Sequence, residues 1–110
     1  MREYAWWRDT ATNMWRTYFR AENDRTLFNS PADAQKCRLC DKVYSSLSEC
    51  DRGIVRAFHT AKMGALAEAV NDYSRQTGIP VNVIYAVIHK TGRAVMVELG
   101  IVNPQDFARG

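Results

Sequence analysis

Apolar residues recur every three or four positions through most of this 110-residue chain, and that spacing constrains its fold more than any other feature. Residues three or four apart lie on one face of an α-helix, so each such run predicts a helix with one apolar face. The run nearest the N-terminus is rich in aromatic residues and comprises Tyr4, Trp7, Ala11, Met14, Trp15 and Tyr18. We expect a helix over about residues 2–21. Because aromatic side chains bury large areas, this face is expected to close the core, with a dimer surface as the alternative.

Signals for helix ends divide the middle of the chain. Ser30-Pro31 predicts the start of a second helix, because Ser caps helix N-termini and Pro suits the first helical position. Ser48 gives the same signal for a third helix, and Gly64 separates that helix from a fourth at about residues 65–76. The middle of the chain therefore predicts three consecutive helices.

The last periodic segment, about residues 80–99, suits a strand by composition alone, because it is rich in β-branched residues. Its inward positions nevertheless follow helical spacing: Val83, Ile84, Val87, Ile88, Thr91, Ala94, Val95 and Leu99. Gly78 supplies a left-handed end to the preceding helix, and Pro80 suits the start of the next. We therefore predict that residues 80–90 are helical and not a strand, and that Gly92 could bend or break the helix.

Length and composition indicate one globular domain. The chain is 46% hydrophobic and 25% charged, which is typical of folded proteins of this size. We predict an all-α fold, a compact bundle of about five helices, with a helical pair in residues 1–46 and a helix-turn-helix region in residues 47–102. No run approaches the ~20 apolar residues of a membrane span, and the N-terminus lacks the features of a signal peptide. We expect a soluble, cytoplasmic protein with no membrane partner.

Three cysteines offer a candidate metal site. Cys37-x-x-Cys40, Cys50 and His59 would provide four zinc ligands if the fold brought them together. However, Cys37 and Cys40 lie on an apolar helical stripe with Leu47, where a free cysteine behaves as a small buried hydrophobe. We expect packing to be their role, and the protein to fold without metal.

Residues 70–88 fit the pattern of a helix-turn-helix. That motif needs an apolar and then a small residue in its first helix, Gly in the turn, and apolar residues on the inner face of its second helix. The chain provides these types in order, as Tyr73, Ser74, Gly78, Ile79, Ile84 and Val87. The alternative interpretation is a helical hairpin with a glycine turn that never touches DNA.

The segment before this motif adds a resemblance to a known family. Its residues are Leu47-Ser48-Glu49-x-Asp51-Arg52-x-Ile54-Val55. This run resembles the opening of sigma-factor region four, and the helix-turn-helix follows in the same order as in that family. The resemblance covers residues 47–91 and extends to small sigma-like regulators of phages and prophages. It implies a DNA-binding transcriptional regulator, with duplex promoter DNA or RNA polymerase as its partner.

Two stretches of the C-terminal half contain bases but no acids, between Asp51 and Glu68 and between Asp72 and Glu98. A net charge of +3 permits DNA binding without requiring it. On the outward face of the second motif helix, Asn82 could pair with an adenine edge, and basic side chains could contact phosphate. The predicted DNA-binding residues are Asn82, Tyr85, His89, Lys90 and Arg93, with Arg52, Arg56 and Lys62 as flanking phosphate contacts. Because the monomer is weakly basic, we expect a homodimer or a polymerase-bound partner.

The sequence contains no recognisable catalytic motif. His59 and His89 are far apart, lack an obvious carboxylate partner, and are interpreted as surface histidines; no phosphate-binding glycine loop or nucleophile motif is present. We expect neither enzymatic activity nor a cofactor. The competing hypothesis is a helical protein-interaction module, such as a phage adaptor or inhibitor, that uses the Trp-rich first helix. Burial of Trp6, Trp7 and Trp15 would favour DNA binding, whereas an exposed patch of Trp6 and Trp7 would favour a protein partner.

Overall fold

The computed structural model describes residues 7–22, 31–62 and 64–100. Within these ranges it contains five α-helices and no strand, and the helices are Arg8–Ala21 (α1), Pro31–Ser46 (α2), Glu49–His59 (α3), Leu66–Thr77 (α4) and Val81–Leu99 (α5). The predicted all-α bundle is therefore confirmed. Residues 81–90 are helical, so the helix predicted from apolar spacing prevails over the strand that composition alone would suggest.

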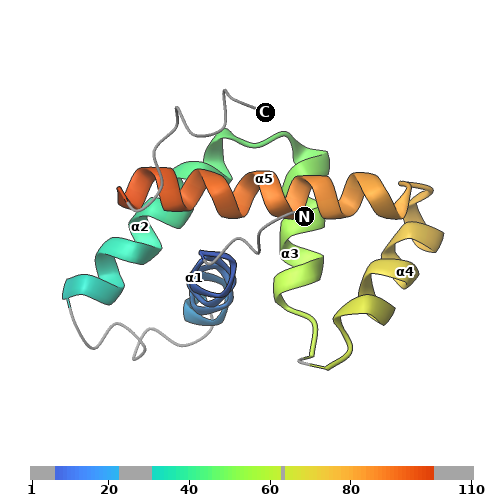
Figure 1. Ribbon diagram of the computed structural model, residues 1–110, viewed down its shortest axis with the longest axis horizontal. Helices are drawn as coiled ribbons and strands as arrows, with labels where there is room; N and C mark the ends of the chain where they lie inside the picture. Colours follow the sequence, from blue (N-terminus) through green and yellow to red (C-terminus); the bar gives the residue numbers. More distant parts are fainter. Residues whose placement is uncertain (1–6, 23–30, 63, 101–110) are drawn as a thin grey trace, which may run out of the picture.

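The longest helix, α5, holds the bundle together because each of the other four helices packs on it. Figure 1 shows α5 running across the whole molecule, with α2 near one end, α4 near the other, and α1 seen end-on between them. Helices α1 and α2 also pack on each other, and α3 packs on both α1 and α4. The core therefore lies along the inner face of α5.

Helix α1 contributes its aromatic face to this core. Trp15 has no exposed surface, and its indole Nε1–H donates a hydrogen bond of 3.3 Å to the carbonyl of Thr91 on α5. Trp7 is only 7% exposed, so core packing, and not a surface patch, is the observed role of both tryptophans. Trp6 and the predicted start of the helix near residue 2 lie outside the described residues.

Glycine allows α1 to approach α5 closely. A Cβ atom added at Gly92 would lie 3.4 Å from both Ala11 and Trp7 of α1. Helix α5 continues through this residue, so of the two effects considered for Gly92, a bend or a break, the break does not occur. Helical hydrogen bonding tolerates one glycine, and here the missing side chain makes room for a neighbouring helix.

The local signals for helix ends are found where they were predicted. The Ser48 hydroxyl accepts a hydrogen bond of 3.1 Å from the Asp51 amide at the start of α3. Gly78 ends α4 with a φ angle of 78°, as predicted, and Gly100 ends α5 in the same way with a φ angle of 83°. The capping role predicted for Ser30 lies outside the described residues.

One predicted inward residue of α5 points to solvent. Val83 is 42% exposed, whereas Ile84 and Val87 are buried. Each helical residue is rotated by about 100° from the one before it. The buried stripe centres on Ile84, Val87 and Thr91, and Val83 lies beyond its margin.

The cysteine stripe of α2 faces the interior as expected. Cys37 is 6% exposed and Cys40 is fully buried, while Cys50 at the start of α3 is exposed. Burial raises the pKa of the Cys40 thiol to about 12, so this side chain stays a neutral thiol. The described part of the chain contains no group of three His, Cys, Asp or Glu side chains placed to hold a metal ion. Among the same residues, no helix is both long and apolar enough to cross a membrane.

Candidate nucleic-acid interface

A short turn joins α4 to α5. It consists of three residues, from Gly78 to Pro80. Gly78 adopts a left-handed φ of 78°, which other residues adopt only at a cost in energy. Ser74 of α4 donates a hydrogen bond of 2.6 Å to the carbonyl of Ile79, and the Thr77 hydroxyl accepts one of 3.3 Å from the Ile79 amide. These bonds hold the entry to α5, and an alanine in place of Ser74 could not make the first of them.

Helices α3, α4 and α5 pack around a shared apolar centre. Ile54 of α3, Val70 of α4 and Ile84 of α5 are each no more than 2% exposed, and they surround one small cavity. Gly53 allows the close approach of α4, because a Cβ atom there would lie 2.6 Å from the Tyr73 hydroxyl oxygen. This packing fixes the direction in which the first half of α5 leaves the turn.

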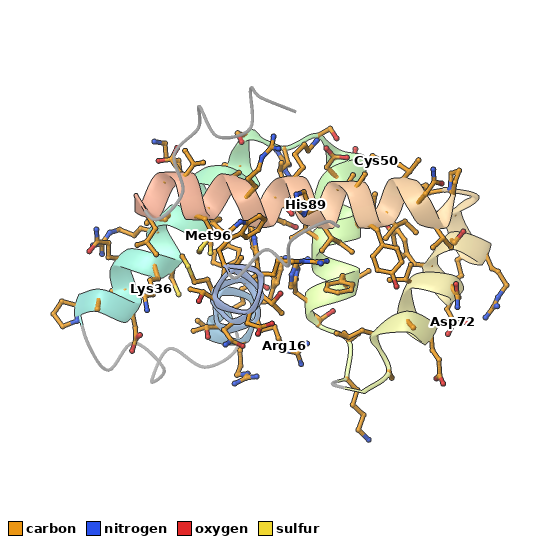
Figure 2. All side chains as sticks on the ribbon, viewed as in Figure 1. Arg16, Lys36, Cys50, Asp72, His89 and Met96 are labelled. Atoms are coloured by element: carbon orange, nitrogen blue, oxygen red, sulfur yellow. The ribbon has the colours of Figure 1, made fainter. Side chains whose placement is uncertain are left out.

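The first half of α5 presents a polar face to solvent. We call this the α5 face and define it by the exposed residues Asn82, Tyr85, Ala86, His89 and Lys90; the apolar Val83 is exposed as well but is not counted in it. Its first turn contains no acidic residue, and Tyr85 is 42% exposed. Figure 2 shows His89 at the middle of α5. Arg93 follows almost one turn after Lys90 and is half-buried. The sequence-predicted residues of α5 therefore lie along one helix, most of them exposed.

Two of the predicted flanking cations, Arg52 and Arg56, form hydrogen bonds within the fold. Arg52 donates to the carbonyls of Tyr44 and Ser45, both at 3.1 Å, and so caps the C-terminal end of α2. Arg56 forms two hydrogen bonds with the Glu22 carboxylate, at 2.9 and 3.0 Å, and its guanidinium lies 5.0 Å from the centre of the Phe19 ring. Both arginines thus connect α3 to the N-terminal helices.

The two remaining lysines differ in their contacts. Lys90 forms an ion pair of 2.9 Å with Asp51 of α3, although its side chain is 55% exposed. Lys62 is exposed in the connection between α3 and α4. Of the predicted phosphate contacts, Lys90 is the one whose ammonium group is both exposed on the α5 face and paired with a neighbouring helix.

His59 is a core residue, so its interpretation as a surface histidine is wrong. It is 4% exposed, and its ring is stacked with those of Trp15 and Phe19, whose centroids are 6.0 and 6.4 Å away. Nδ1 lies 2.9 Å from the Val55 carbonyl, and because a carbonyl can only accept, Nδ1 carries the proton. Burial, assisted by the charge of Arg16, lowers the pKa of His59 to about 4. The available signal was the position of His59 four residues after Val55, on the apolar stripe of α3.

The chemistry offered by the α5 face is that of binding. An amide, a phenol, an imidazole and an ammonium group on one helix can together donate and accept hydrogen bonds and attract an anion. The major groove of duplex DNA is wide enough to admit an exposed helix of this kind.

The chain matches no protein-family model, and it has no significant match among curated proteins or solved structures.

Proposed function

We propose that the protein is a DNA-binding transcriptional regulator of the sigma-like helix-turn-helix type, as in phage-encoded regulators, and that it contacts duplex DNA through the α5 face. The observation that carries this proposal is the exposed helix surface, acid-free from Val81 to Arg93, directly after the Gly78 turn. In helix-turn-helix proteins the second helix enters the major groove, with its N-terminal residues against the base edges. The packing of α3 and α4 behind α5 supports that presentation.

The residues of the α5 face divide by chemistry. Asn82 and Tyr85, nearest the turn, are assigned to base edges, because an amide or phenol can both donate and accept. His89, Lys90 and Arg93 lie further along α5 and are assigned to phosphates, with Lys62 as a flanking contact. The internal contacts of Arg52 and Arg56 favour a structural role over direct phosphate binding.

Lys90 must exchange partners to reach phosphate. Its present partner, Asp51, lies in the first turn of α3, where the helix dipole stabilises a carboxylate. Releasing Lys90 therefore leaves the carboxylate in a favourable place. The Lys90 side chain is 55% exposed, so a phosphate can approach this ammonium group from solvent and compete for it.

The modest net charge bears on the partners that we propose. With a charge of +3, one protomer attracts DNA weakly, so binding as a homodimer or beside RNA polymerase in the cytoplasm is part of the proposal. The alternative, a protein-interaction module that uses the Trp-rich first helix, is weakened because Trp7 and Trp15 are buried.

Selection from a random duplex library at moderate salt tests the proposal, followed by titration of the selected sequence. Contact with four or five phosphates would give a log–log salt slope of roughly −4. Lys90→Ala and Arg93→Ala should weaken binding to all sequences, whereas Asn82→Ala and Tyr85→Ala should change the sequence preference. Arg38→Ala removes the same charge from an exposed site on α2, outside the α5 face, and should have little effect.

Two variants that each neutralise one carboxylate separate a local effect on DNA binding from an effect of net charge. Asp51→Asn removes an acid beside the α5 face and releases Lys90, so it should tighten DNA binding several-fold. Asp72→Asn changes net charge equally on α4, where Asp72 pairs with Arg75, and should have a smaller effect. Equal effects of the two variants would show that only net charge matters. If no sequence is enriched, and the Lys90 and Arg93 variants bind DNA like the parent protein, the proposal is wrong.

A further inference from the structure

Exposed apolar side chains gather at the start of α5. Among the residues that the structure describes, the large hydrophobic side chains that are exposed are those of Val83 and Tyr85, each 42% exposed. Both lie in the first two turns of α5, which begins at Val81. The neighbouring Ile84 and Val87 belong to the core cluster, whereas Val83 does not. Packing within the bundle therefore gives no reason for a hydrophobic side chain at Val83, and contact with a ligand would.

Val83 shares one side of α5 with residues of the α5 face. Residues three, four or seven apart lie along one side of a helix, so Val83, Ala86 and Lys90 form one line. Asn82 lies beside this line, four residues before Ala86. Ala86 is exposed and carries only a methyl group, so it leaves room for a ligand to approach the helix closely. Val83 therefore borders the place where a base edge would meet the helix.

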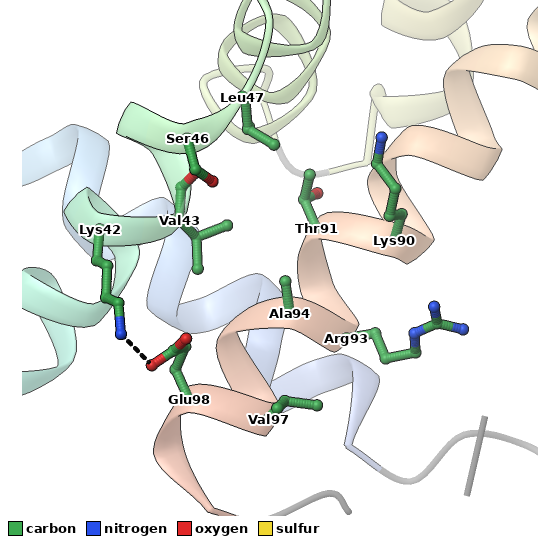
Figure 3. Close-up of a pocket in the computed structure, with 10 residues that line it drawn as sticks. All are labelled: Lys42, Val43, Ser46, Leu47, Lys90, Thr91, Arg93, Ala94, Val97 and Glu98. Atoms are coloured by element: carbon green, nitrogen blue, oxygen red, sulfur yellow. Dashed lines mark hydrogen bonds and ion pairs between the residues drawn. The ribbon is translucent and has the colours of Figure 1, made fainter. Parts of the chain in front are cut away.

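The basic residues of α5 lie further along the same side of the helix. Figure 3 shows the side chains of Lys90 and Arg93 on the side of α5 away from Lys42 of α2, and helical spacing places Val83 there as well. Val83 precedes Lys90 by seven residues, a rise of about 10 Å at 1.5 Å per residue. In a helix-turn-helix the N-terminal residues of the second helix meet base edges. Val83 is therefore placed against bases and not against phosphates.

The chemistry of valine selects among the bases. In the major groove thymine presents an apolar group, its C5 methyl, beside a single acceptor, whereas the other bases present only hydrogen-bond donors and acceptors there. A valine side chain against a polar edge leaves those groups without partners, which costs free energy. Against the thymine methyl it removes apolar surface from water, which is favourable. Of the four bases, thymine is the one that Val83 fits.

We propose that Val83 contacts the C5 methyl group of a thymine, close to the adenine assigned to Asn82, and that the DNA site of this protein depends on that methyl group. This inference rests on the proposed function, since it names a chemical group that the same helix reads. Burial of one methyl group corresponds to about a fourfold change in affinity. Val83 is thus a residue that determines specificity, which its exclusion from the polar α5 face conceals.

Uracil in place of thymine tests the inference, because it pairs with adenine in the same way and lacks only the methyl group. The full chain is used to select from two random duplex libraries at moderate salt, one made with thymine and one with uracil. The selected thymine-containing duplex and its uracil counterpart are then titrated by fluorescence anisotropy. We expect the uracil form to bind about fourfold more weakly for each methyl group contacted. Uracil at single positions identifies the thymine concerned.

Two variants of α5 separate reading of the methyl group from general affinity. Val83→Ala shortens an exposed side chain and suits a helix, so the bundle should remain folded, as circular dichroism would check. It should bind the thymine form about fourfold more weakly than the parent and bind the uracil form as well as the parent does, so that discrimination is lost. Lys90→Ala, on the same side of α5, should weaken binding to both forms by the same factor and keep the discrimination.

Each contrary result has a distinct meaning. Equal affinity of the parent for the thymine and uracil forms, with uracil at every position, would overturn this inference and leave the DNA-binding proposal standing. Full discrimination by Val83→Ala would show that another residue reads the methyl group, and the assignment to Val83 would be wrong. No enrichment from either library would overturn the DNA-binding proposal and this inference together.

Discussion

Stability of the protein should fall steeply on mild acidification because of His59. The ring is buried among aromatic side chains, and its pKa is lowered from 6.5 to about 4, chiefly by burial. Between these values the unfolded chain binds a proton on His59 that the folded chain does not. Stability therefore rises with pH through this window: the contribution is fully present above about 6.5 and is lost as pH falls towards 4. At ~1.36 kcal/mol per pKa unit, the loss amounts to about 3 kcal/mol.

The variant His59→Phe removes the titration while keeping a planar apolar ring beside Trp15 and Phe19. Repacking costs about 1–3 kcal/mol at neutral pH, so the absolute stability of the variant is not the measured quantity. The test is the difference between the free energies of unfolding at pH 7 and pH 4.5, from urea denaturation followed by the fluorescence of the buried tryptophans. We expect the parent to lose about 2–3 kcal/mol more than the variant over this range.

The other histidine provides the control. His89→Gln removes the histidine of α5 and leaves His59 in place, so the pH dependence that this variant retains belongs to His59 and to the groups that both proteins share. Carboxylates are common to all three proteins, so their titration cancels in the comparison. If the parent and His59→Phe lose the same stability between pH 7 and pH 4.5, the His59 ring is not held neutral by burial and the reasoning is wrong.

Three substitutions test the local structure by urea denaturation. Gly78→Ala should cost about 1–2 kcal/mol by left-handed strain alone, since a Cβ atom there meets nothing within 4 Å; Gly78→Asn should cost less. Gly92→Val should cost about 1–3 kcal/mol by forcing α1 from α5, and a cost no larger than that of the exposed Ala86→Val would contradict this. Ser48→Ala should cost about 0.5–2 kcal/mol by removing the cap on the Asp51 amide, and an unchanged midpoint would show that the cap contributes nothing.

The helix boundaries could be predicted because their causes are local. The Ser48 cap joins residues three apart, and the left-handed Gly78 needs only its own lack of a side chain. The exposed side of α5 follows from the same kind of rule, since helical spacing assigns Asn82 and Lys90 to one side and Ile84 to the other. Val83 lies at the margin of that stripe, where spacing alone separates inside from outside least well.

The ion pairs of Arg56 and Lys90 could not be predicted because their partners are distant in sequence. Arg56 pairs with Glu22, 34 residues away, and Lys90 pairs with Asp51, 39 residues away. Composition showed a basic segment around Arg56, but tertiary packing turned that side chain towards α1. The burial of His59 likewise depends on Trp15, which belongs to another helix. Spacing gives the face on which a side chain lies, and only the packed fold gives its partner.

The position of Lys90 links DNA binding to the packing of the bundle. Its ammonium group belongs to the α5 face and is paired with Asp51 of α3. A DNA phosphate and the Asp51 carboxylate would therefore compete for the same cation. Asp51→Asn removes that competitor, so it should tighten DNA binding in the parent protein but have little effect once Lys90→Ala has removed the ammonium group. The two single variants and the double variant are compared by titration of the selected duplex. Additive effects of the two substitutions would show that Asp51 acts through the net charge of the protein, and not through this lysine.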